Sequence, residues 1–467
     1  MRTGLMALAE GGRSVPVREF RPDELFFSIT DPRGVIVHAN AVFVRLSGYS
    51  FEELQQHPHN IVRGPAMPRG AFRLIWDELQ AGRTVASYVA NQAKDGVRYE
   101  VFAAQVPIEG GYLSIRLRPE DQGLRDTVFE IFDRARAVEA ATAGGAREQA
   151  AAGAEFILTE LAAFGIPDMA ALTRRTLSRE VTATLGLVSE IEAPSGRDTL
   201  EVLLRKIHLV SRLLLEPLRT LEQVDAASSR LTADFASAQP RAQLVGDLRS
   251  ALNEITEGLL FTDTGTSGAD TIGALSTASA RTADQLDRMG VGFGEAYSRV
   301  SGLRLEVETL AQQIAVFALQ NQMIGRFASE LLRGDAVEPP GQVMRLLHQA
   351  LASHFDELTE GIDRVNALMA AAPETIARAR QSADGIESQL LGWCDAAELT
   401  LRGRGNAAPA RLAEGTARVR AQAVQGLAWL DEIAALTDEL RRVDVRIDAQ
   451  PIQATLKFIG MVTAEID

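Results

Sequence analysis

The sequence has almost none of the residues that build covalent or thiolate-bound metal scaffolds. It holds one cysteine, Cys394, among 467 residues. A single cysteine excludes an intrachain disulfide framework and any zinc or iron–sulfur site built from cysteines. Low cysteine use also fits a reducing compartment. We therefore expect a cytoplasmic protein whose fold depends on its apolar residues, which make up 46% of the chain.

Long uncharged hydrophobic runs are also missing. A membrane-spanning helix needs about 18 or more predominantly apolar residues in succession. The best candidate, Ile314–Ile324, is interrupted by glutamines and followed by Arg326. The apolar stretch near the N-terminus breaks at Glu10, which leaves it too short for a secretory signal. We expect a soluble protein without membrane insertion.

Basic residues are in the minority. The chain has 48 Lys and Arg against 62 Asp and Glu, a net charge of −14. Charges nearly balance within residues 21–119, so the excess acid lies in the rest of the chain. Nucleic acids and anionic membranes are bound by clustered Lys and Arg. We therefore expect no nucleic-acid partner.

Recognisable catalytic motifs are absent from the sequence. There is no Gly-rich phosphate loop followed by Lys-Ser/Thr, and no nucleotide-binding glycine box of a histidine kinase. His208 and His348 lie in helical patterns without an adjacent acidic residue, which suits packing or surface histidines. His348 and His354 are six residues apart and so lie on different helix faces, which argues against a metal site. We expect that the protein is not an enzyme; an unrecognised kinase or cyclase would have to turn over nucleotide.

The first quarter of the chain has the pattern of a small α+β domain. Short β-prone runs alternate with turn residues, as at Asp31–Gly34. Strand pair, short helices and three further strands indicate one antiparallel sheet. The predicted strands are Leu25–Thr30, Val35–His38, Thr84–Gln92, Arg98–Pro107 and Gly111–Arg118, and the predicted helices are Ala41–Leu46, Phe51–Gln56 and Ala71–Ala81.

The remainder of the chain is predicted to be helical. After residue 120, apolar residues recur at three- and four-residue spacing, as in Leu200, Leu203, Leu204 and Ile207. The fold class expected is therefore multidomain, an α+β domain followed by a long all-α bundle or coiled-coil region. We divide the chain into a flexible N-terminal segment (1–20), the α+β domain (21–119), connector helices (120–240), a further helical region (241–333) and C-terminal helices (341–467).

A specific residue pattern marks the first domain. It comprises Asn40-Ala-Val-Phe-Val-Arg-Leu-Ser-Gly-Tyr49, Glu52-Glu-Leu54 and Pro58-His-Asn-Ile-Val-Arg63, and it continues to Tyr112-Leu-Ser-Ile-Arg116. In this pattern residues 21–119 resemble the PAS domain of bacterial aerotaxis receptors. Asn40 can cap the helix that begins at Ala41, and Gly48 can close it. The resemblance implies a sheet curled around short helices, with an interior pocket.

The resemblance implies a flavin, FAD, in that pocket. The candidate contacts that match the family pattern are Asn60, Arg63, Trp76, Asn91 and Tyr99. The sequence departs from the family where Gly64 replaces a histidine, Ala66 an aspartate, Val85 a tryptophan, Ser87 a glycine and Glu100 an aromatic residue. These changes remove two polar contacts and one stacking ring. A domain without any cofactor is therefore an alternative.

Haem is a further alternative, because oxygen-sensing PAS domains can hold it through an axial histidine. His57 and His59 come just before the pocket helix and are the candidate ligands. His59 also belongs to the pattern of the flavin-type domains, where it is not a haem ligand. A loop histidine without a role is the simpler interpretation of both.

A second, weaker resemblance lies at Val307–Ile324. This stretch is similar to the signalling tip of chemoreceptors, the hairpin that contacts the chemotaxis kinase and its coupling protein. The candidate partner-binding residues are Phe317, Leu319, Gln320 and Asn321. The acidic and arginine positions that should follow are mostly absent, and Pro339-Pro340 interrupts the expected return helix. An ordinary buried amphipathic helix is the alternative.

These features together predict a soluble aerotaxis or energy-taxis transducer that senses redox state or oxygen. Its output would be helix contact with a chemotaxis coupling protein, a histidine kinase or other chemoreceptors. A homodimer is the expected state, because PAS domains and long amphipathic helices both favour dimers. The alternative is a PAS-containing scaffold or regulator outside chemotaxis that binds no cofactor.

Overall fold

The computed structural model describes residues 17–188, 194–236, 248–258, 269–403, 410–426, 438 and 445–466. The chain divides into two compact units. Unit 1 contains Met1–Arg219, Glu308–Ile362 and Arg446–Asp467, and unit 2 contains Thr220–Val307 and Asp363–Val445. Most of the predicted flexible segment 1–20 lies outside the described residues.

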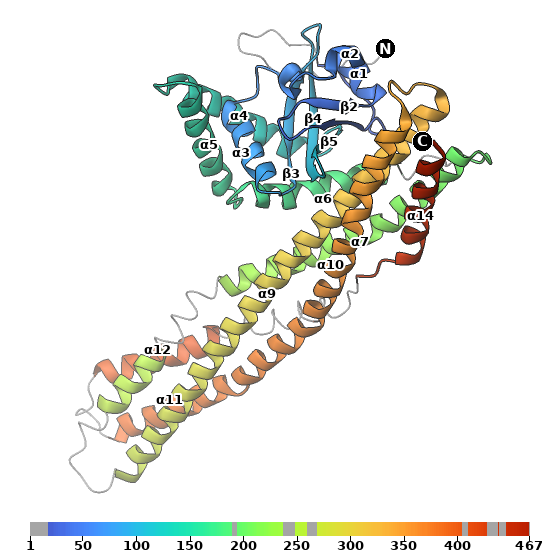
Figure 1. The fold of residues 1–467 in the computed structure, drawn as a ribbon. Coiled ribbons are helices and arrows are strands. Elements are labelled where there is room, and N and C mark those ends of the chain that lie inside the picture. The colour runs from blue at the N-terminus through green and yellow to red at the C-terminus, as the bar shows by residue number, and fades with distance from the viewer. Residues whose placement is uncertain are drawn as a thin grey trace. The chain divides into compact units, whose positions relative to one another are not determined.

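Unit 1 begins with a five-stranded antiparallel sheet (Figure 1). Its strand order is β2-β1-β5-β4-β3. Every predicted strand is present with its ends within one residue of the prediction, because alternation and turn residues mark strand limits locally. The strands are β1 (Phe26–Thr30), β2 (Ile36–Ala39), β3 (Val85–Gln92), β4 (Arg98–Ile108) and β5 (Gly111–Leu117).

Short helices connect β2 to β3 and cover one face of the sheet. They are α1 (Ala41–Ser47), α2 (Phe51–Leu54), the 3₁₀ helix η1 (His59–Val62) and α3 (Arg69–Gln80). The predicted cap is confirmed, since Asn40 Oδ1 accepts the amide of Phe43 at 3.4 Å. Gly48 ends α1 with φ +71°, a conformation that favours glycine. The helix η1 was not predicted, because four residues carry too little periodicity.

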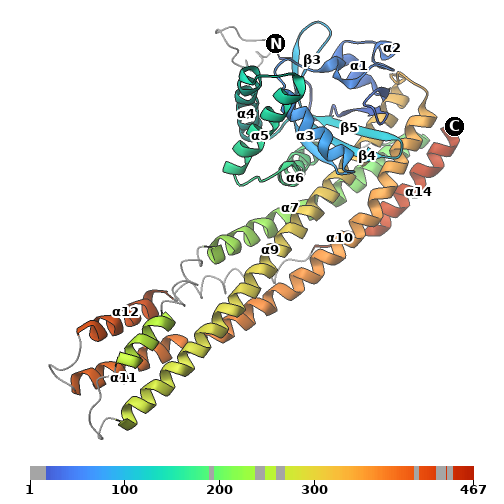
Figure 2. The same ribbon diagram turned by 60° about the vertical axis from the view of Figure 1, so that its left-hand side comes forward.

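Long helices make up the rest of unit 1. The chain leaves β5 into α4 (Gln122–Ala141), α5 (Ala146–Ala163) and α6 (Met169–Val188). Segments of α7 (Thr199–Ala236), α9 (Ala269–Arg333) and α10 (Pro340–Ala383) follow, and α14 (Ala449–Ile466) completes the unit. Figure 2 shows α9 reversing direction into α10, through a turn in which Gly334 has φ +72°.

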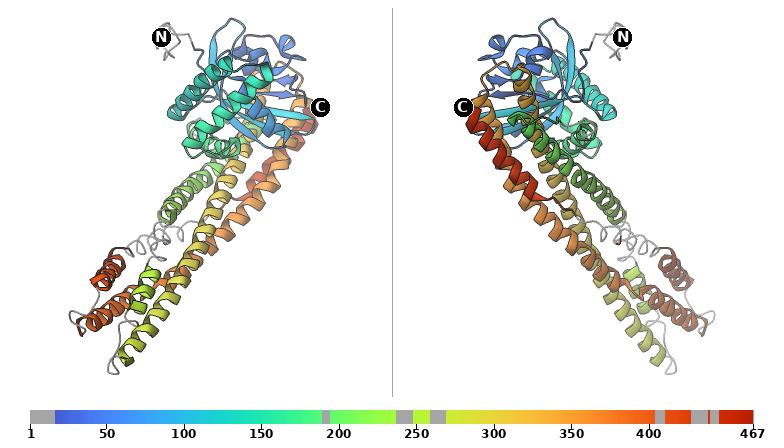
Figure 3. Two further views of the ribbon diagram at one scale, coloured as in Figure 1. Left: turned by 90° about the vertical axis from the view of Figure 1, so that its left-hand side faces the viewer. Right: turned by 90° about the vertical axis from the view of Figure 1, so that its right-hand side faces the viewer.

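The C-terminal helix packs back on unit 1. Figure 3 shows α14 lying along α10. The Lys206 ammonium of α7 lies 5.2 Å from the centre of the Phe458 ring of α14. On the other side, Gly460 of α14 leaves room for the imidazole of His348 in α10. The last described residues of the chain are therefore held beside α7 and α10.

The described residues of unit 2 are helical apart from a turn at Asp384 and Gly385 and from Val445. It contains the remaining parts of α7, α9 and α10 together with α11 (Ile386–Gly403) and α12 (Ala410–Gly426). An ion pair between Arg304 and Asp225 joins α9 to α7 at 3.2 Å. The predicted fold class, an α+β domain followed by a long all-α region, is confirmed. Within the described helices, none has both the length and the apolar character needed to cross a membrane.

Candidate functional site

A cavity of about 400 Å³ lies between the sheet and the short helices of the N-terminal domain. Strands β3, β4 and β5 form one wall, and η1 and α3 form the other. Cavities of roughly 300–1,000 Å³ are typical of sites for small ligands. The domain therefore has room for a compact ring system.

Four of the five candidate flavin contacts line this cavity. They are Asn60, Arg63, Trp76 and Asn91. Trp76 packs edge-on against Tyr112, with ring centres 5.5 Å apart. Tyr99, the fifth candidate, does not line the cavity. Its fully buried ring lies in the domain core, 6.5 Å from that of Phe26.

The two candidate haem ligands occupy different places. His59 lines the cavity, whereas His57 is an exposed residue outside it. Among the described residues there is no group of three or more His, Cys, Asp or Glu side chains arranged to hold a metal ion. The structure thus brings one of the two histidines to the pocket.

The inward face of β5 supplies cavity residues that were not among the predicted site residues. Tyr112, Ser114 and Arg116 all line the cavity, because alternate residues of a strand face the same side. Arg116 could have been recognised from the sequence, because it is a charged residue at an inward-facing position of a predicted strand. Arg116 is only 2% exposed.

Arg116 fixes the protonation of His59. Its Nη1 group donates to Ser28 Oγ at 3.2 Å, and its Nη2 group bonds to His59 Nε2. A guanidinium can only donate, so His59 Nε2 accepts and the neutral ring carries its proton on Nδ1. Burial, and then the charge of Arg116, hold the pKa of His59 well below its usual value. Burial also lowers the pKa of Arg116 to about 10, so Arg116 stays charged at neutral pH.

This geometry does not fit haem ligation. An axial histidine binds iron through a free nitrogen lone pair. The lone pair of His59 Nε2 is engaged by Arg116, and the Nδ1 atom carries the proton. His57 lies outside the cavity. Neither candidate histidine is placed as an axial ligand.

A flat ring with a polar edge fits the cavity better. The side-chain amide nitrogen of Asn91 and the hydroxyl of Ser114 are buried and have no hydrogen-bond partner. Val89, Ala103 and Ile75 supply apolar walls. Buried polar groups of this kind are normally satisfied, so each is available to a ligand. The lining residues are therefore compatible with a flavin ring.

One departure from the family pattern, Gly64, has a structural explanation. A Cβ atom at this position would lie 2.5 Å from the carbonyl oxygen of Ala90. The close approach accompanies a β-bridge between Arg63 and Asn91. Neither Gly64 nor Val85 lines the cavity.

The neutral state of His59 predicts a pH dependence of stability. An unfolded histidine titrates near pH 6.5, whereas the folded pKa of His59 is lower. Below pH 6.5 the unfolded chain therefore binds a proton that the folded chain does not, and stability falls as pH falls. The loss approaches about 1.4 kcal/mol per pH unit. We expect His59→Gln, whose amide oxygen can still accept from Arg116, to lack this component. Urea unfolding of both proteins between pH 5 and 7 measures this difference. If the free energy of unfolding changed equally with pH in the wild type and in His59→Gln, the prediction would be wrong.

Known proteins are similar to this chain over a limited region. No family model matches the chain. The aerotaxis receptor of Escherichia coli (strain K12) is 45% identical over 105 residues, which is 21% of this chain and 21% of that protein. A nitrogen fixation regulatory protein of Klebsiella pneumoniae is 31% identical over 81 residues, 17% of this chain and 16% of that protein. The chain thus matches about a fifth or less of the length of these relatives.

The predicted resemblance to an aerotaxis-receptor PAS domain is confirmed. Two solved structures are also similar. The PAS domain of a protein from Colwellia psychrerythraea is 26% identical, with a TM-score of 0.18, and covers 20% of this chain and 84% of its own. A blue-light activated histidine kinase of Erythrobacter litoralis is 16% identical, with a TM-score of 0.21, and covers 42% of this chain and 70% of its own.

Carboxylates of the surrounding helices bind the PAS domain directly. We call Glu139, Glu180 and Glu330 the helical carboxylates, and Glu338, in the turn after α9, binds the domain in a similar way. Glu139 of α4 accepts the amides of Arg69 and Gly70 at 3.0 and 2.7 Å. These amides open α3, so the carboxylate lies where the helix dipole favours negative charge. The helix that carries Trp76 of the cavity is thereby fixed to α4.

Glu180 of α6 binds the PAS domain at β3 and at the segment that follows β5. It accepts the Tyr88 hydroxyl of β3 at 2.7 Å and the amides of Glu120 and Asp121 at 2.7 and 3.1 Å. Burial raises the pKa of Glu180, and these donors oppose the rise. The contact joins α6 to both the sheet and the segment that leaves it.

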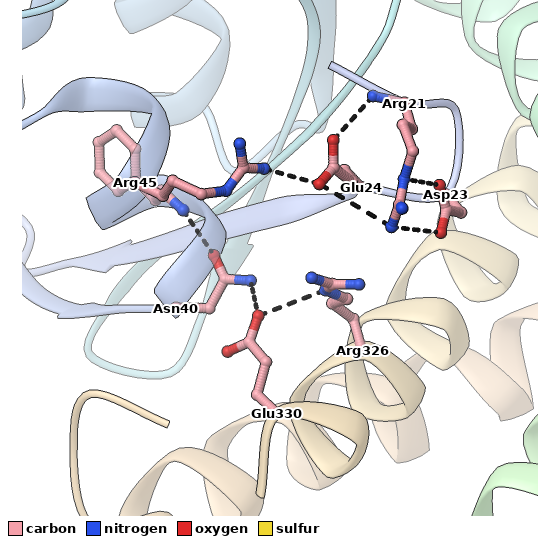
Figure 4. A network of polar contacts seen from close by, with 8 residues as sticks. Arg21, Asp23, Glu24, Asn40, Arg45, Arg326 and Glu330 are labelled. Carbon is pink, nitrogen blue, oxygen red and sulfur yellow. Dashed lines mark hydrogen bonds and ion pairs between the residues drawn. The ribbon is translucent and has the colours of Figure 1, made fainter. Parts of the chain in front are cut away.

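Glu330 and Glu338 hold the other edge. Figure 4 shows Glu330 of α9 accepting from Asn40 Nδ2, at 2.8 Å, and from Arg326. Glu330 also accepts the amide of Ala41 at 3.1 Å. Glu338, in the turn after α9, lies 2.6 Å from His38 Nδ1 and accepts the amide of Ala39 at 3.0 Å. Strand β2 and the start of α1 are thus bound to the α9–α10 turn.

The candidate partner-binding residues lie inside unit 1. Phe317, Leu319, Gln320 and Asn321 are each no more than 2% exposed. Asn321 Nδ2 donates to the carbonyl of Ile207 at 3.0 Å and to Ser211 Oγ at 2.9 Å, both in α7. The Phe317 ring lies 6.1 Å from that of Phe355 in α10. This is the packing expected of a buried amphipathic helix, and the four side chains are covered by their own chain.

Proposed function

We propose that the chain is a cytoplasmic signal transducer, and that the state of the PAS pocket changes how the PAS domain binds the surrounding helices. One observation carries the proposal: two of the helical carboxylates bind elements that line the pocket, Glu139 at α3 and Glu180 at β3. Glu139 holds the start of α3, and Glu330 holds the start of α1. A shift of α3 on ligand binding would therefore strain contacts to α4 directly. Signalling of this kind needs two packing arrangements of similar free energy, not catalysis.

We propose redox state or oxygen as the signal, through bound FAD. The similarity to an aerotaxis receptor supports this choice, as does a cavity with apolar walls, an indole and two unpartnered polar groups. A bound flavin would supply a ring whose charge changes as it gains or loses electrons. Asn60, Arg63, Trp76 and Asn91 are the residues that would hold it.

The proposed output is contact between helices and another protein. A chemotaxis coupling protein, a histidine kinase or chemoreceptors are the partners, and the active form is a homodimer. In this proposal the chain itself is not an enzyme. A fluorescent fusion is expected to join chemoreceptor clusters in cells with intact arrays, and a diffuse signal there would refute this output.

The sensing step is tested by spectroscopy joined to hydrogen exchange. We expect the freshly purified full chain to show flavin absorption that bleaches on reduction and returns in air. Amide exchange in α1 and at the end of α9 should differ between the oxidised and reduced states, because Glu330 of α9 binds the start of α1. Flavin bands with unchanged exchange would refute coupling between pocket and helices.

A second candidate is a cofactor-free scaffold or regulator outside chemotaxis. The burial of Phe317 and Gln320 favours it, because the stretch that is similar to a signalling tip offers no exposed side chains at these positions. A spectrum without flavin bands, together with a diffuse fusion, is the result expected of the scaffold.

A further inference from the structure

A buried positive charge in the PAS cavity lacks a negative partner. Arg116 is 2% exposed, and its contacts within the described chain are neutral: the Ser28 hydroxyl, the Ser114 carbonyl and the His59 imidazole. Buried guanidinium groups are normally paired with carboxylates, because an uncompensated charge is costly to remove from water. Arg116 is therefore an unusual residue for an empty core.

The rest of the cavity lining adds positive and not negative charge. Arg33, Arg63 and Arg73 also line it, while no aspartate or glutamate does. Arg33 and Arg73 are exposed, and each pairs with an acidic neighbour outside the cavity. Arg63 is half-buried and lies over the Phe72 ring, 4.3 Å from its centre. The uncompensated charge is thus concentrated on Arg116 in the interior.

Two further groups in the cavity lack partners. Ser114 Oγ, two residues before Arg116 on the same face of β5, is buried without a hydrogen bond. The Asn91 amide nitrogen on β3 is likewise buried and unpartnered. Since native structures leave few such atoms, each is a place where a ligand atom completes the bonding.

We propose that the PAS cavity binds a small planar ligand through a negatively charged group, which Arg116 neutralises and Ser114 hydrogen-bonds, while Asn91 binds another polar atom of the ligand. Charge-assisted hydrogen bonds to arginine are strong, and a cavity with apolar walls strengthens them further. The charge could be a carboxylate on an aromatic metabolite or the negative charge that a flavin ring gains on reduction. Both sources share the same chemistry, a planar ring with an anionic edge.

The competing interpretation is that Arg116 serves the fold alone. Its guanidinium lies 5.7 and 5.2 Å from the centres of the Phe26 and Phe43 rings, and such cation–π contacts stabilise a protein. The two interpretations predict opposite results for Arg116→Met in the ligand-free chain. Removal of an uncompensated charge raises the unfolding temperature, whereas loss of a structural residue lowers it.

The test compares benzoate with its neutral counterpart benzamide on the full chain. We expect millimolar benzoate to raise the unfolding temperature of the wild type and benzamide to have little effect. Arg116→Met should weaken benzoate binding at least tenfold, and Arg116→Lys should retain part of it. Arg83→Met is the matched control, since Arg83 is exposed, pairs with Glu78 and lies outside the cavity.

Four outcomes would overturn the proposal: a lower unfolding temperature of ligand-free Arg116→Met, equal stabilisation by benzamide, no stabilisation by benzoate, or a benzoate effect that survives Arg116→Met. An acid extract of the purified chain identifies the source of the charge. A flavin in the extract absorbs visible light, whereas an aromatic carboxylate does not.

The proposal rests on the proposed function in that the pocket ligand is the signal. Loss of benzoate selectivity with an intact helix response refutes the ligand class alone. Intact selectivity without a helix response refutes the transducer function alone.

Discussion

Replacing Asn40 with aspartate should release the PAS domain from the end of α9 while the PAS domain itself stays folded. Asn40 Oδ1 accepts the amides of Phe27 and Phe43 inside the domain, and aspartate can make both bonds and cap α1 equally well. The amide nitrogen of Asn40, however, donates to Glu330, and both side chains are buried. The substitution therefore sets two buried carboxylates against each other.

We expect this contact to weaken by about 3 kcal/mol, because a buried carboxylate loses its partner and gains a like charge. The measurement is amide hydrogen exchange. In the wild type the amide of Ala41 donates to Glu330. In the variant this amide and those at the end of α9 should exchange faster, while the amides of β3 to β5 should not.

A double-mutant cycle supplies the control. Combining Asn40→Asp with Glu330→Gln removes the repulsion and gives back a donor, so most of the protection should return. Glu24→Gln is the matched control elsewhere in the same network. Both of its arginine partners, Arg21 and Arg45, are exposed, so each pair is worth at most about 1 kcal/mol. A double variant as unprotected as the single one would show that Glu330 does not hold the PAS domain.

Local sequence signals predicted the PAS fold because its determinants lie close together in the chain. The cap by Asn40 acts on Phe43, and the left-handed Gly48 ends the same short helix. Strand alternation likewise separates the two faces of β5 within seven residues. Such features follow from steric preferences of the backbone and from side-chain alternation, which can be seen in a short stretch.

The contacts that bind the PAS domain to the surrounding helices could not be predicted in this way. Glu330 binds Asn40 across 290 residues, and Glu338 binds His38 across 300. Nothing near either glutamate indicates a partner in the first domain. Tyr99 shows the related limit of a resemblance: it shares a face of β4 with Ala103, yet its ring packs in the core while Ala103 lines the cavity. Tertiary packing, and not residue type, decides between these roles.

Replacing Gly70 with alanine should destabilise the PAS domain, although the same change usually strengthens a helix. Gly70 is the second residue of α3, where it crosses α5. A Cβ atom would lie 2.3 Å from the amide nitrogen of Ala154 and 2.4 Å from the carbonyl carbon of Gly153. Both are backbone atoms, so the helices must separate. Overpacking of this kind costs about 3 kcal/mol, more than the roughly 1 kcal/mol that alanine adds in helix propensity.

The chain offers a closely matched control in Gly123, the second residue of α4. A Cβ atom there meets no atom nearer than the Asp121 carboxylate oxygen at 3.8 Å. We therefore expect Gly123→Ala to be neutral or stabilising by up to about 1 kcal/mol. Amide exchange of β3 to β5 measures both variants on the same elements. Because Gly70 also donates to Glu139, its replacement should move α3 away from α4 and expose the amides of Arg69 and Gly70. If Gly70→Ala stabilised the domain as Gly123→Ala does, α3 and α5 would not cross closely, and α3 would lack the rigid attachment that the proposed signal requires.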